Sequence, residues 1–450
     1  GISKLMPGSF MILDFKNINK AQESVPTQYW DLNENIKTSK KNLFVGSDYE
    51  VSLEIESKLE RSVKQQMISD VSLGGFLSGG IDSSTIIALM QKNSIDKVKT
   101  FTIGFADNEY DEAIYAKDVA NHLGTDHTEL YVTPQDAMSV IPHLPSIYCE
   151  PFSDSSQIPT YLVSKLASDN VTVSLSGDGG DEIFAGYNRY IEGQRTWSSF
   201  NKLPKSVRHS FARALVSVSP HIWDSCFSLV KNILPKKLRF TAPGDKIHKL
   251  ADVMFEDTLR SYYEKLCSHW HDPKEIVFGA KEHLSLLSLD SEWLDSSDFT
   301  EKMMAMDTRT YMSDDILVKV DRAAMACSLE TRVPMLSKQV FQSAWSLPLE
   351  QKIRGGKGKW PLRQILYKYV PKELIERPKQ GFGMPIGDWL RGPLKEWAGD
   401  LLNRDTLLLE GYINPDSVLK LWEEHLEGEN SRQYHLWDVL MFQSWLEENK

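Results

Sequence analysis

The sequence predicts an α/β protein built on a doubly wound parallel sheet, with a mainly helical C-terminal part. Apolar, strand-like runs alternate with helix-like patterns as far as about residue 190, and this alternation is typical of parallel strands joined by helices. Two Gly-rich polar loops, residues 78–84 and 176–182, each follow such a run and open a helix. Ligands of open parallel sheets bind outside the carboxyl ends of the strands, so we expect both loops at one ligand site.

The composition is that of an ordinary globular chain. Its 450 residues are enough for about two or three domains. Of these residues, 41% are hydrophobic and 25% are charged, as in ordinary globular proteins. The net charge of −11 argues against a general nucleic-acid partner. No apolar run approaches a membrane span and no signal peptide opens the chain, so we expect a cytoplasmic protein without a membrane partner. Four cysteines without a C-x-x-C pair suit reduced, structural thiols: Cys149, Cys226, Cys267 and Cys327.

The first 50 residues are predicted to form short strands and turns, with extended segments at 10–15 and 28–32. A polar, Lys-rich stretch at 38–42 is interpreted as a linker. From Tyr49 onward, apolar residues recur in helical phase as far as Val63.

The sheet core is expected over about residues 70–190, and residues 190–450 are expected to be mainly helical. The predicted strands are 71–77, 98–105, 129–132 and 171–175. The predicted helices are 85–90, 111–123, 156–167 and 183–187.

The first loop, Ser78-Gly79-Gly80-Ile81-Asp82-Ser83-Ser84, has the chemistry of an anion site. Backbone N–H groups and a helix N-terminus attract negative charge there, and the two glycines let a phosphate approach the backbone closely. The carboxylate of Asp82 suits such a loop if Mg²⁺ lies between it and the phosphate oxygens. No Walker A loop is present: Gly358-Lys359 is followed by Trp360 and lacks a glycine at the required upstream position. The Rossmann pattern is also absent after the first strand. The alternative is a Ser/Gly turn that only caps a helix.

The second loop, Ser176-Gly177-Asp178-Gly179-Gly180-Asp181-Glu182, follows the predicted strand 171–175. Asp181 is therefore expected to join Asp82 in holding Mg²⁺, because two carboxylates leave room on this ion for phosphate oxygens and water. The alternative is a Gly/Asp turn at a helix start.

Ordered sequence blocks between about residues 50 and 395 resemble the synthetase part of the glutamine-hydrolysing asparagine synthetase family, one of the N-type ATP pyrophosphatases. The blocks are Leu77–Ser84, Phe101–Phe105, His122–His127, Glu150–Ser156, Ser176–Glu182, Phe184–Tyr187, Lys319–Arg322, Leu329–Pro334 and Arg377–Gly383.

The resemblance implies that the two loops hold Mg-ATP. The residues expected to border the adenine are Leu77 and Ile103, and the backbone of Ser176 and Gly177 is expected to contact the nucleotide. The residues expected to cradle the phosphates are Ser78, Gly79, Gly80, Ser83 and Ser84. Asp82 and Asp181 are the candidate metal ligands.

Two lysines are candidates for contact with the phosphates. Lys379, in the last block, is the preferred cation for stabilising charge on the phosphate oxygens in the transition state, and its alternative is a solvated lysine. Lys359 follows a Gly-rich stretch and either reaches phosphate or is a solvated surface residue. Asp178 stands where many asparagine synthetases carry glutamate. A carboxylate there is expected to take a proton as ammonia attacks.

Other charged residues in the blocks have weaker interpretations. Asp321, Arg322, Glu330 and Arg332 form either a structural ion-pair network or part of the substrate site. His122 and His127 are expected to pack or cap rather than bind metal.

The implied reaction has two steps. A carboxylate, with L-aspartate as the leading candidate, attacks ATP to give an acyl-adenylate and pyrophosphate, and ammonia then displaces AMP to form the amide. The alternatives are another acceptor, such as a sugar uronate in surface-polysaccharide synthesis, and a catalytically silent nucleotide-binding module.

The family begins with a glutaminase domain, and residues 1–50 resemble only its end. We therefore expect a synthetase domain over residues 51–450 that uses free ammonia, or ammonia from a glutaminase domain of a longer parent chain or a partner. A homodimer is possible.

Overall fold

The structure, a computed structural model, describes residues 3–13, 16, 24–105, 112–230, 243–270, 272–281, 284–377, 384–428 and 432–450. The chain divides into two compact units. Unit 1 comprises Gly1–Thr133, Pro159–Tyr190 and Leu294–Gln380, and unit 2 comprises Pro134–Ile158, Ile191–Trp293 and Gly381–Lys450.

Unit 1 contains a five-stranded parallel sheet with the strand order β5-β4-β3-β6-β7. The strands are β3 (Leu73–Phe76), β4 (Lys99–Phe105), β5 (Asp126–Val132), β6 (Val173–Leu175) and β7 (Glu330–Arg332). The chain runs outward from β3 to β5 and then returns to place β6 on the other side of β3. The predicted doubly wound parallel sheet is therefore confirmed, with its switch point between β3 and β6.

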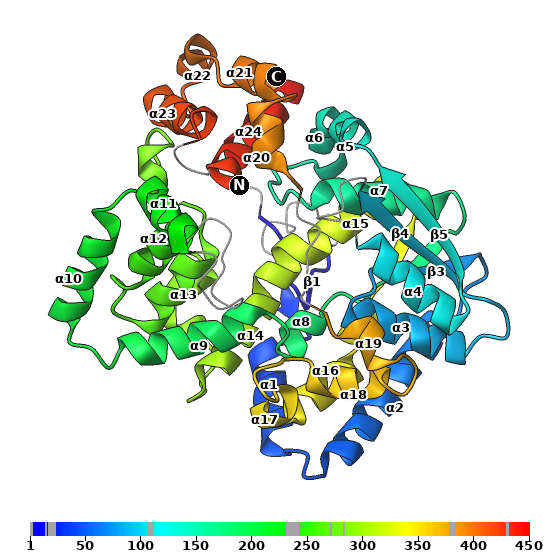
Figure 1. Ribbon diagram of the computed structural model, residues 1–450. Helices are drawn as coiled ribbons and strands as arrows, with labels where there is room; N and C mark the ends of the chain where they lie inside the picture. Colours follow the sequence, from blue (N-terminus) through cyan, green and yellow to red (C-terminus); the bar gives the residue numbers. More distant parts are fainter. Residues whose placement is uncertain are drawn as a thin grey trace. The chain divides into compact units, whose positions relative to one another are not determined.

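Helices cover both faces of this sheet, as its buried strands require (Figure 1). On one face, Phe101 of β4 belongs to a buried cluster with Ala167 of α7 (Gln157–Ser168) and Ala324 of α15 (Leu317–Ala326). On the other face, a Cβ added to Gly75 would lie 2.4 Å from Ile87 Cδ1 of α3 (Ile81–Lys92). A strand glycine thus lets α3 approach the sheet closely, which fixes the start of this helix beside the strand ends.

The remaining elements complete the two units. In unit 1 the helices are α1 (Leu32–Lys41), α2 (Asp48–Gln66), α4 (Ala113–Leu123), α8 (Gly180–Ile183), α14 (Phe299–Arg309), α16 (Lys338–Ser346), α17 (Leu349–Lys352), α18 (Trp360–Leu366) and α19 (Lys372–Ile375), with a π-helix at Met312–Ile316 and a 3-10 turn at Pro334–Leu336. A small hairpin pairs β1 (Ser9–Phe10) with β2 (Thr27–Gln28).

Unit 2 is helical in its described part. It contains α5 (Pro134–Val140), α6 (Leu144–Tyr148), α10 (Lys205–Val216), α11 (Pro220–Val230), α12 (Pro243–Val253), α13 (Leu259–Cys267), α20 (Ile386–Arg391), α21 (Lys395–Leu401), α22 (Arg404–Glu410), α23 (Pro415–Leu426), α24 (Gln433–Glu448) and most of α9 (Asn188–Phe200), with 3-10 turns at Ile141–His143, Pro273–Glu275, Leu286–Ser288 and Asp290–Glu292. Among the described residues, no helix has the length and apolar character needed to cross a bilayer.

Two local predictions are wrong. The stretch 38–42 is not a linker, because α1 runs through residue 41; the Asp31 side chain accepts from the Glu34 amide at 2.8 Å and starts this helix. The helix expected at 183–187 also does not form. Ala185 adopts a left-handed φ of +55°, so the chain turns between α8 and α9 instead.

Candidate active site

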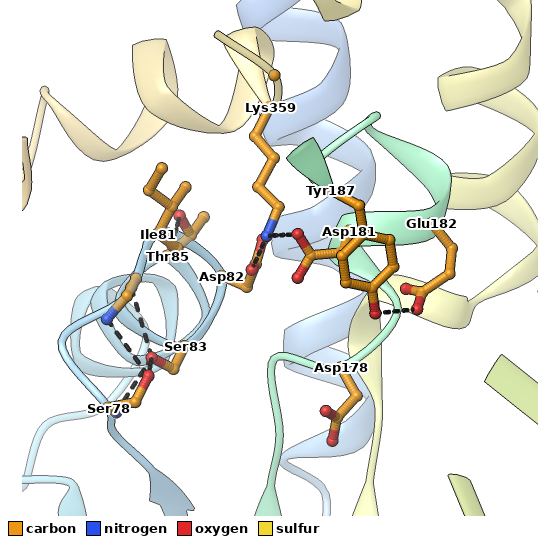
Figure 2. A network of polar contacts seen from close by, with 12 residues as sticks. Ser78, Ile81, Asp82, Ser83, Thr85, Asp178, Asp181, Glu182, Tyr187 and Lys359 are labelled. Carbon is orange, nitrogen blue, oxygen red and sulfur yellow. Dashed lines mark hydrogen bonds and ion pairs between the residues drawn. The ribbon is translucent and has the colours of Figure 1, made fainter. Parts of the chain in front are cut away.

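The two Gly-rich loops lie side by side because they leave neighbouring strands in the same direction. Gly75 of β3 pairs with Leu175 of β6, and each strand ends within one residue of that pair. The expectation that both loops lie at one edge of the sheet is therefore confirmed (Figure 2).

The first loop is held by its own hydroxyl groups. The Ser78 amide donates to Ser83 Oγ at 3.2 Å, the two hydroxyls lie 2.9 Å apart, and the Gly80 amide donates to Ser78 Oγ at 3.3 Å. Gly79 needs its glycine, since its φ is +70° and an added Cβ would lie 2.9 Å from the Ala116 amide nitrogen. Gly80 is the N-cap of α3 and no side chain caps this helix start, which leaves first-turn amides suited to an anion.

Glycines of the second loop bring it against the first. A Cβ at Gly177 would lie 2.6 Å from the Ser83 amide nitrogen, and one at Gly180 would lie 2.3 Å from Asp82 Oδ1. Any larger residue would push the loops apart. This close approach places Asp181, next in sequence, opposite Asp82.

Lys359 joins the two carboxylates. Its Nζ forms ion pairs with Asp82 Oδ2 and, at 2.8 Å, with Asp181 Oδ1 (Figure 2). Lys359 is only 5% exposed, so the interpretation as a solvated surface residue is wrong. Burial alone would lower the pKa of its ammonium, but Asp181 and Asp82 outweigh burial and hold the pKa above its ordinary value. The two carboxylates therefore favour the charged form of this buried lysine.

The backbone around Lys359 explains how a lysine reaches this position. Lys359 has a left-handed φ of +58°, and its amide donates to the Phe184 carbonyl at 2.9 Å. A Cβ at Gly358 would lie 1.8 Å from the Ala185 carbonyl oxygen. The Gly-rich stretch before Lys359 thus packs directly on the turn that follows the second loop.

The carboxylates of Asp82 and Asp181 fit Mg²⁺ by their chemistry and their convergence. Both supply the hard oxygen ligands that Mg²⁺ prefers, and both contact the same ammonium group of Lys359. Within the described ranges, no group of three acidic, histidine or cysteine side chains is placed to hold a metal by itself. The pair thus suits an ion that takes its remaining ligands from phosphate and water.

Asp178 lies on the same loop, apart from this ion pair (Figure 2). The Ser176 hydroxyl donates to its carboxylate. Burial raises the pKa of Asp178 above its ordinary value, against the lowering effects of this hydrogen bond and of the Lys319 charge. Lys319, on α15, is 8% exposed and pairs with Asp315 at 3.6 Å.

Glu182 and Tyr187 stand in the sequence blocks without an expected role, and the fold brings both to the site (Figure 2). Glu182 is 1% exposed, and the Tyr187 hydroxyl donates to its Oε1 at 2.7 Å. Burial raises the pKa of Glu182 to about 7. Arg189 stacks on the Tyr187 ring, with its Cζ 4.1 Å from the ring centroid, and pairs with Asp307 at 2.6 Å. The block Phe184–Tyr187 marked this segment, but not the ion pair that Arg189 forms with Asp307 of α14.

Arg377 also contacts the first loop. Its Nη2 donates to the Ser78 carbonyl at 3.2 Å, and its Cζ lies 3.9 Å from the Tyr115 ring centroid. Arg377 begins the block that contains Lys379. Lys379 itself lies outside the described residues, so its role stays a prediction.

The expected adenine border stays a prediction as well. Leu77 and Ile103 are each 1% exposed and Ser84 is fully buried, so all three side chains are packed in this conformation. Ser176 donates its amide to the Arg332 carbonyl at 2.8 Å, which ties the second loop to β7.

Among the remaining charged candidates, Arg332, His122 and His127 make structural contacts in unit 1. Arg332 donates to Glu330 at 2.6 Å and to the Gln66 carbonyl at 2.7 Å, so it anchors the end of α2. His122 Nε2 lies 2.9 Å from the Tyr369 carbonyl oxygen, and His127 Nδ1 lies 2.8 Å from Thr100 Oγ1. Asp321 and Arg322 are exposed.

Comparison with known proteins shows what this chain is similar to. A family model described as Asparagine synthase matches residues 54–447. The chain is 32% identical over 394 residues to asparagine synthetase (glutamine-hydrolyzing) 1 of Bacillus subtilis, covering 87% of this chain and 58% of that protein. It is 32% identical over 397 residues to a putative asparagine synthetase (glutamine-hydrolyzing) of Mycobacterium tuberculosis, covering 87% and 57%. Amidase chyE of Penicillium rubens is 23% identical over 455 residues, covering 92% and 63%.

The chain thus spans 58% or less of the length of the two asparagine synthetases. The family model nevertheless covers most of this chain and includes both loops and Lys359. The chain belongs to the asparagine synthase family.

Proposed function

We propose that this chain carries out ATP-dependent amide synthesis. A carboxylate, L-aspartate in the leading case, attacks the α-phosphorus of ATP to give an acyl-adenylate and pyrophosphate, and ammonia then displaces AMP to give the amide. The observation that carries this proposal is the convergence of Asp82 and Asp181, from two phosphate-type loops, on the buried ammonium of Lys359. The names of the two asparagine synthetases support the same reaction class.

The residues of the first loop would bind the β- and γ-phosphates through amides at the start of α3. Mg²⁺, held by Asp82 and Asp181, would neutralise phosphate charge when bound. Lys359 stays protonated in its acidic surroundings, so it can stabilise the charge that develops on the phosphate oxygens as pyrophosphate leaves. We assign it this role beside Lys379, which remains the second candidate.

Asp178 would act in the second step. As ammonia attacks the acyl carbon, the nitrogen must lose a proton. A carboxylate whose pKa is raised by burial is a better base for that proton than an exposed one. Ammonia would come from solution, or from a glutaminase domain of a longer protein or a partner.

A second acceptor class follows from Asp178. Aspartate is one methylene shorter than the glutamate found in many asparagine synthetases, which leaves more room for the acceptor. A sugar uronate is therefore the alternative substrate.

The test is a pyrophosphate-release assay with Mg-ATP, ammonium and one carboxylate at a time. We expect release that depends on L-aspartate, and asparagine and AMP in equal amounts by mass spectrometry. Release with a uronate but not with aspartate would select the alternative acceptor. Tight ATP binding without release for any carboxylate would contradict the proposed activity and favour a silent nucleotide-binding module.

A further inference from the structure

Glu376 is a carboxylate outside the two Gly-rich loops on which three donors converge. It follows α19 and lies one residue before Arg377. Lys357 Nζ forms an ion pair with its Oε2, and Arg363 Nη1 and the Tyr367 hydroxyl both donate to its Oε1. Burial would raise the pKa of Glu376, but the hydrogen bonds from Lys357 and Tyr367 outweigh it and lower the pKa to about 2. The carboxylate is therefore ionised near neutral pH.

Two of these donors belong to the segment that carries Lys359 or adjoin it. Lys357 closes the tight turn before it, since the backbones of Arg354 and Lys357 donate to each other at 2.9 Å. Arg363 uses its Nε to donate to the carbonyl of Gly358, the residue directly before Lys359, at 3.0 Å. The carboxylate of Glu376 thus holds the Lys359 segment from two sides.

Arg377 fixes this carboxylate relative to the first Gly-rich loop. Its Nη2 donates to the Ser78 carbonyl at 3.2 Å, and its Cζ lies 3.9 Å from the Tyr115 ring centroid. Glu376 is the neighbour of Arg377 in the sequence. A chain of contacts within unit 1 therefore runs from the first loop through Arg377 and Glu376 to the segment of Lys359.

Lys359 needs such support because its backbone conformation is unfavourable. Its φ of +58° is uncommon for a lysine, and residues in such conformations persist only where their surroundings determine them. The contacts of Glu376 add only modestly to stability, because Lys357 is exposed and exposed ion pairs contribute little. Removing them should therefore change the position of Lys359 more than the stability of the fold.

We propose that Glu376 is a positioning residue, which holds the segment 357–359 so that the Lys359 ammonium meets the two carboxylates of the candidate site. The consequence for turnover rests on the proposed function, whereas the positioning itself is a property of the fold. A misplacement of about 1 Å can lower a rate about 100-fold, so a residue that acts only through Lys359 can still control the reaction.

Hydrogen–deuterium exchange of the full chain, without substrates, tests the positioning. In Glu376→Gln the backbone amides of residues 354–363 should exchange at least about tenfold faster, while the rest of unit 1 exchanges as in the parent protein. The matched control is Glu373→Gln, which neutralises an exposed carboxylate of α19 and should change neither. Unchanged exchange at residues 354–363 in Glu376→Gln, or faster exchange throughout unit 1, would overturn the proposal whether or not the chain is a ligase.

Pyrophosphate release tests the link to Lys359. Glu376→Gln should lower kcat at least about tenfold and leave the KM for Mg-ATP within about threefold, because the proposed role of Lys359 is in the transition state. In a Lys359→Met background the same change should cost less than about threefold, since its effect passes through the missing ammonium. An unchanged kcat, or equal factors in both backgrounds, would overturn the proposal. A parent protein without pyrophosphate release would contradict the proposed function, and the exchange result would still decide the positioning.

Discussion

Replacing Lys359 with methionine tests the centre of the proposed site. Methionine keeps much of the buried volume but removes the ammonium that joins Asp82 to Asp181. At 2.8 Å from Asp181, and with an effective dielectric constant of about 20, that ammonium attracts the carboxylate by about 6 kcal/mol before desolvation is subtracted. Removing one partner of a buried ion pair lowers the free energy of unfolding by about 3–5 kcal/mol, because the remaining charges are uncompensated.

Two measurements follow from this value. The melting temperature of Lys359→Met should fall by roughly 10 °C, at about 2–4 °C per kcal/mol for a domain of this size. Added Mg²⁺ should restore more of it than it adds to the parent protein, because the ion supplies the missing positive charge and binds only the folded site. Pyrophosphate release should fall about 100- to 1,000-fold even at saturating Mg²⁺, as expected for loss of a group that stabilises the transition state.

The matched control is Lys97→Met, which removes an exposed lysine from the same unit. This variant should leave the melting temperature and the rate of pyrophosphate release unchanged. Near-normal turnover of Lys359→Met would refute its role in the transition state. A melting temperature equal to the parent's would refute the ion-pair reasoning.

Three further predictions concern neighbouring features. Gly180→Ala should lower the melting temperature and weaken ATP binding measured by calorimetry, because its Cβ would lie 2.3 Å from Asp82 Oδ1. Gly399→Ala, the control, has open space around the added Cβ and should change neither the melting temperature nor ATP binding. Equal effects of the two variants would contradict the steric reasoning. Asp178→Asn should retain aspartate-dependent exchange of pyrophosphate into ATP, while ammonium-dependent amide formation should fall about 100-fold. Equal loss of the exchange and of amide formation would exclude a role confined to the ammonia step. Burial lowers the pKa of Lys352 from its ordinary 10.5 to about 7. Between about pH 7 and pH 10.5 the unfolded chain therefore binds more protons at this lysine than the folded chain does. The free energy of unfolding should accordingly fall as the pH falls toward 7. Lys352→Met should abolish that slope in urea denaturation at pH 7 and pH 9, and an unchanged slope would assign it to another group.

Much of the site could be predicted because its signals are local. A strand followed by glycines, hydroxyls and a helix start places backbone amides at one point whatever the rest of the fold does, so the first and second loops were recognisable. Their convergence followed from a general rule about parallel sheets, and the pairing of β3 with β6 confirms it. Family membership, which the ordered blocks predicted, is likewise confirmed.

The short strand β7 could not be predicted from its own residues. Glu330–Arg332 is a polar tripeptide without an apolar run, and it becomes a strand only because β6 offers an unpaired edge. The left-handed turn at Ala185 was missed for a similar reason. Packing of Gly358 on the Ala185 carbonyl decides that conformation, not the propensity of Ala185.

The sequence by itself determined the class of fold, the two loops and the family, because periodicity, glycine placement and motif order are properties of neighbours along the chain. Only the tertiary structure decided between a solvated and a buried, ion-paired Lys359. Lys359 is 277 residues from Asp82 in the sequence, and its charge state depends on both carboxylates meeting it away from water. The burial and ion pairing of a side chain depend on residues that are distant in the sequence. The local pattern at Gly358-Lys359-Trp360 therefore could not predict either property.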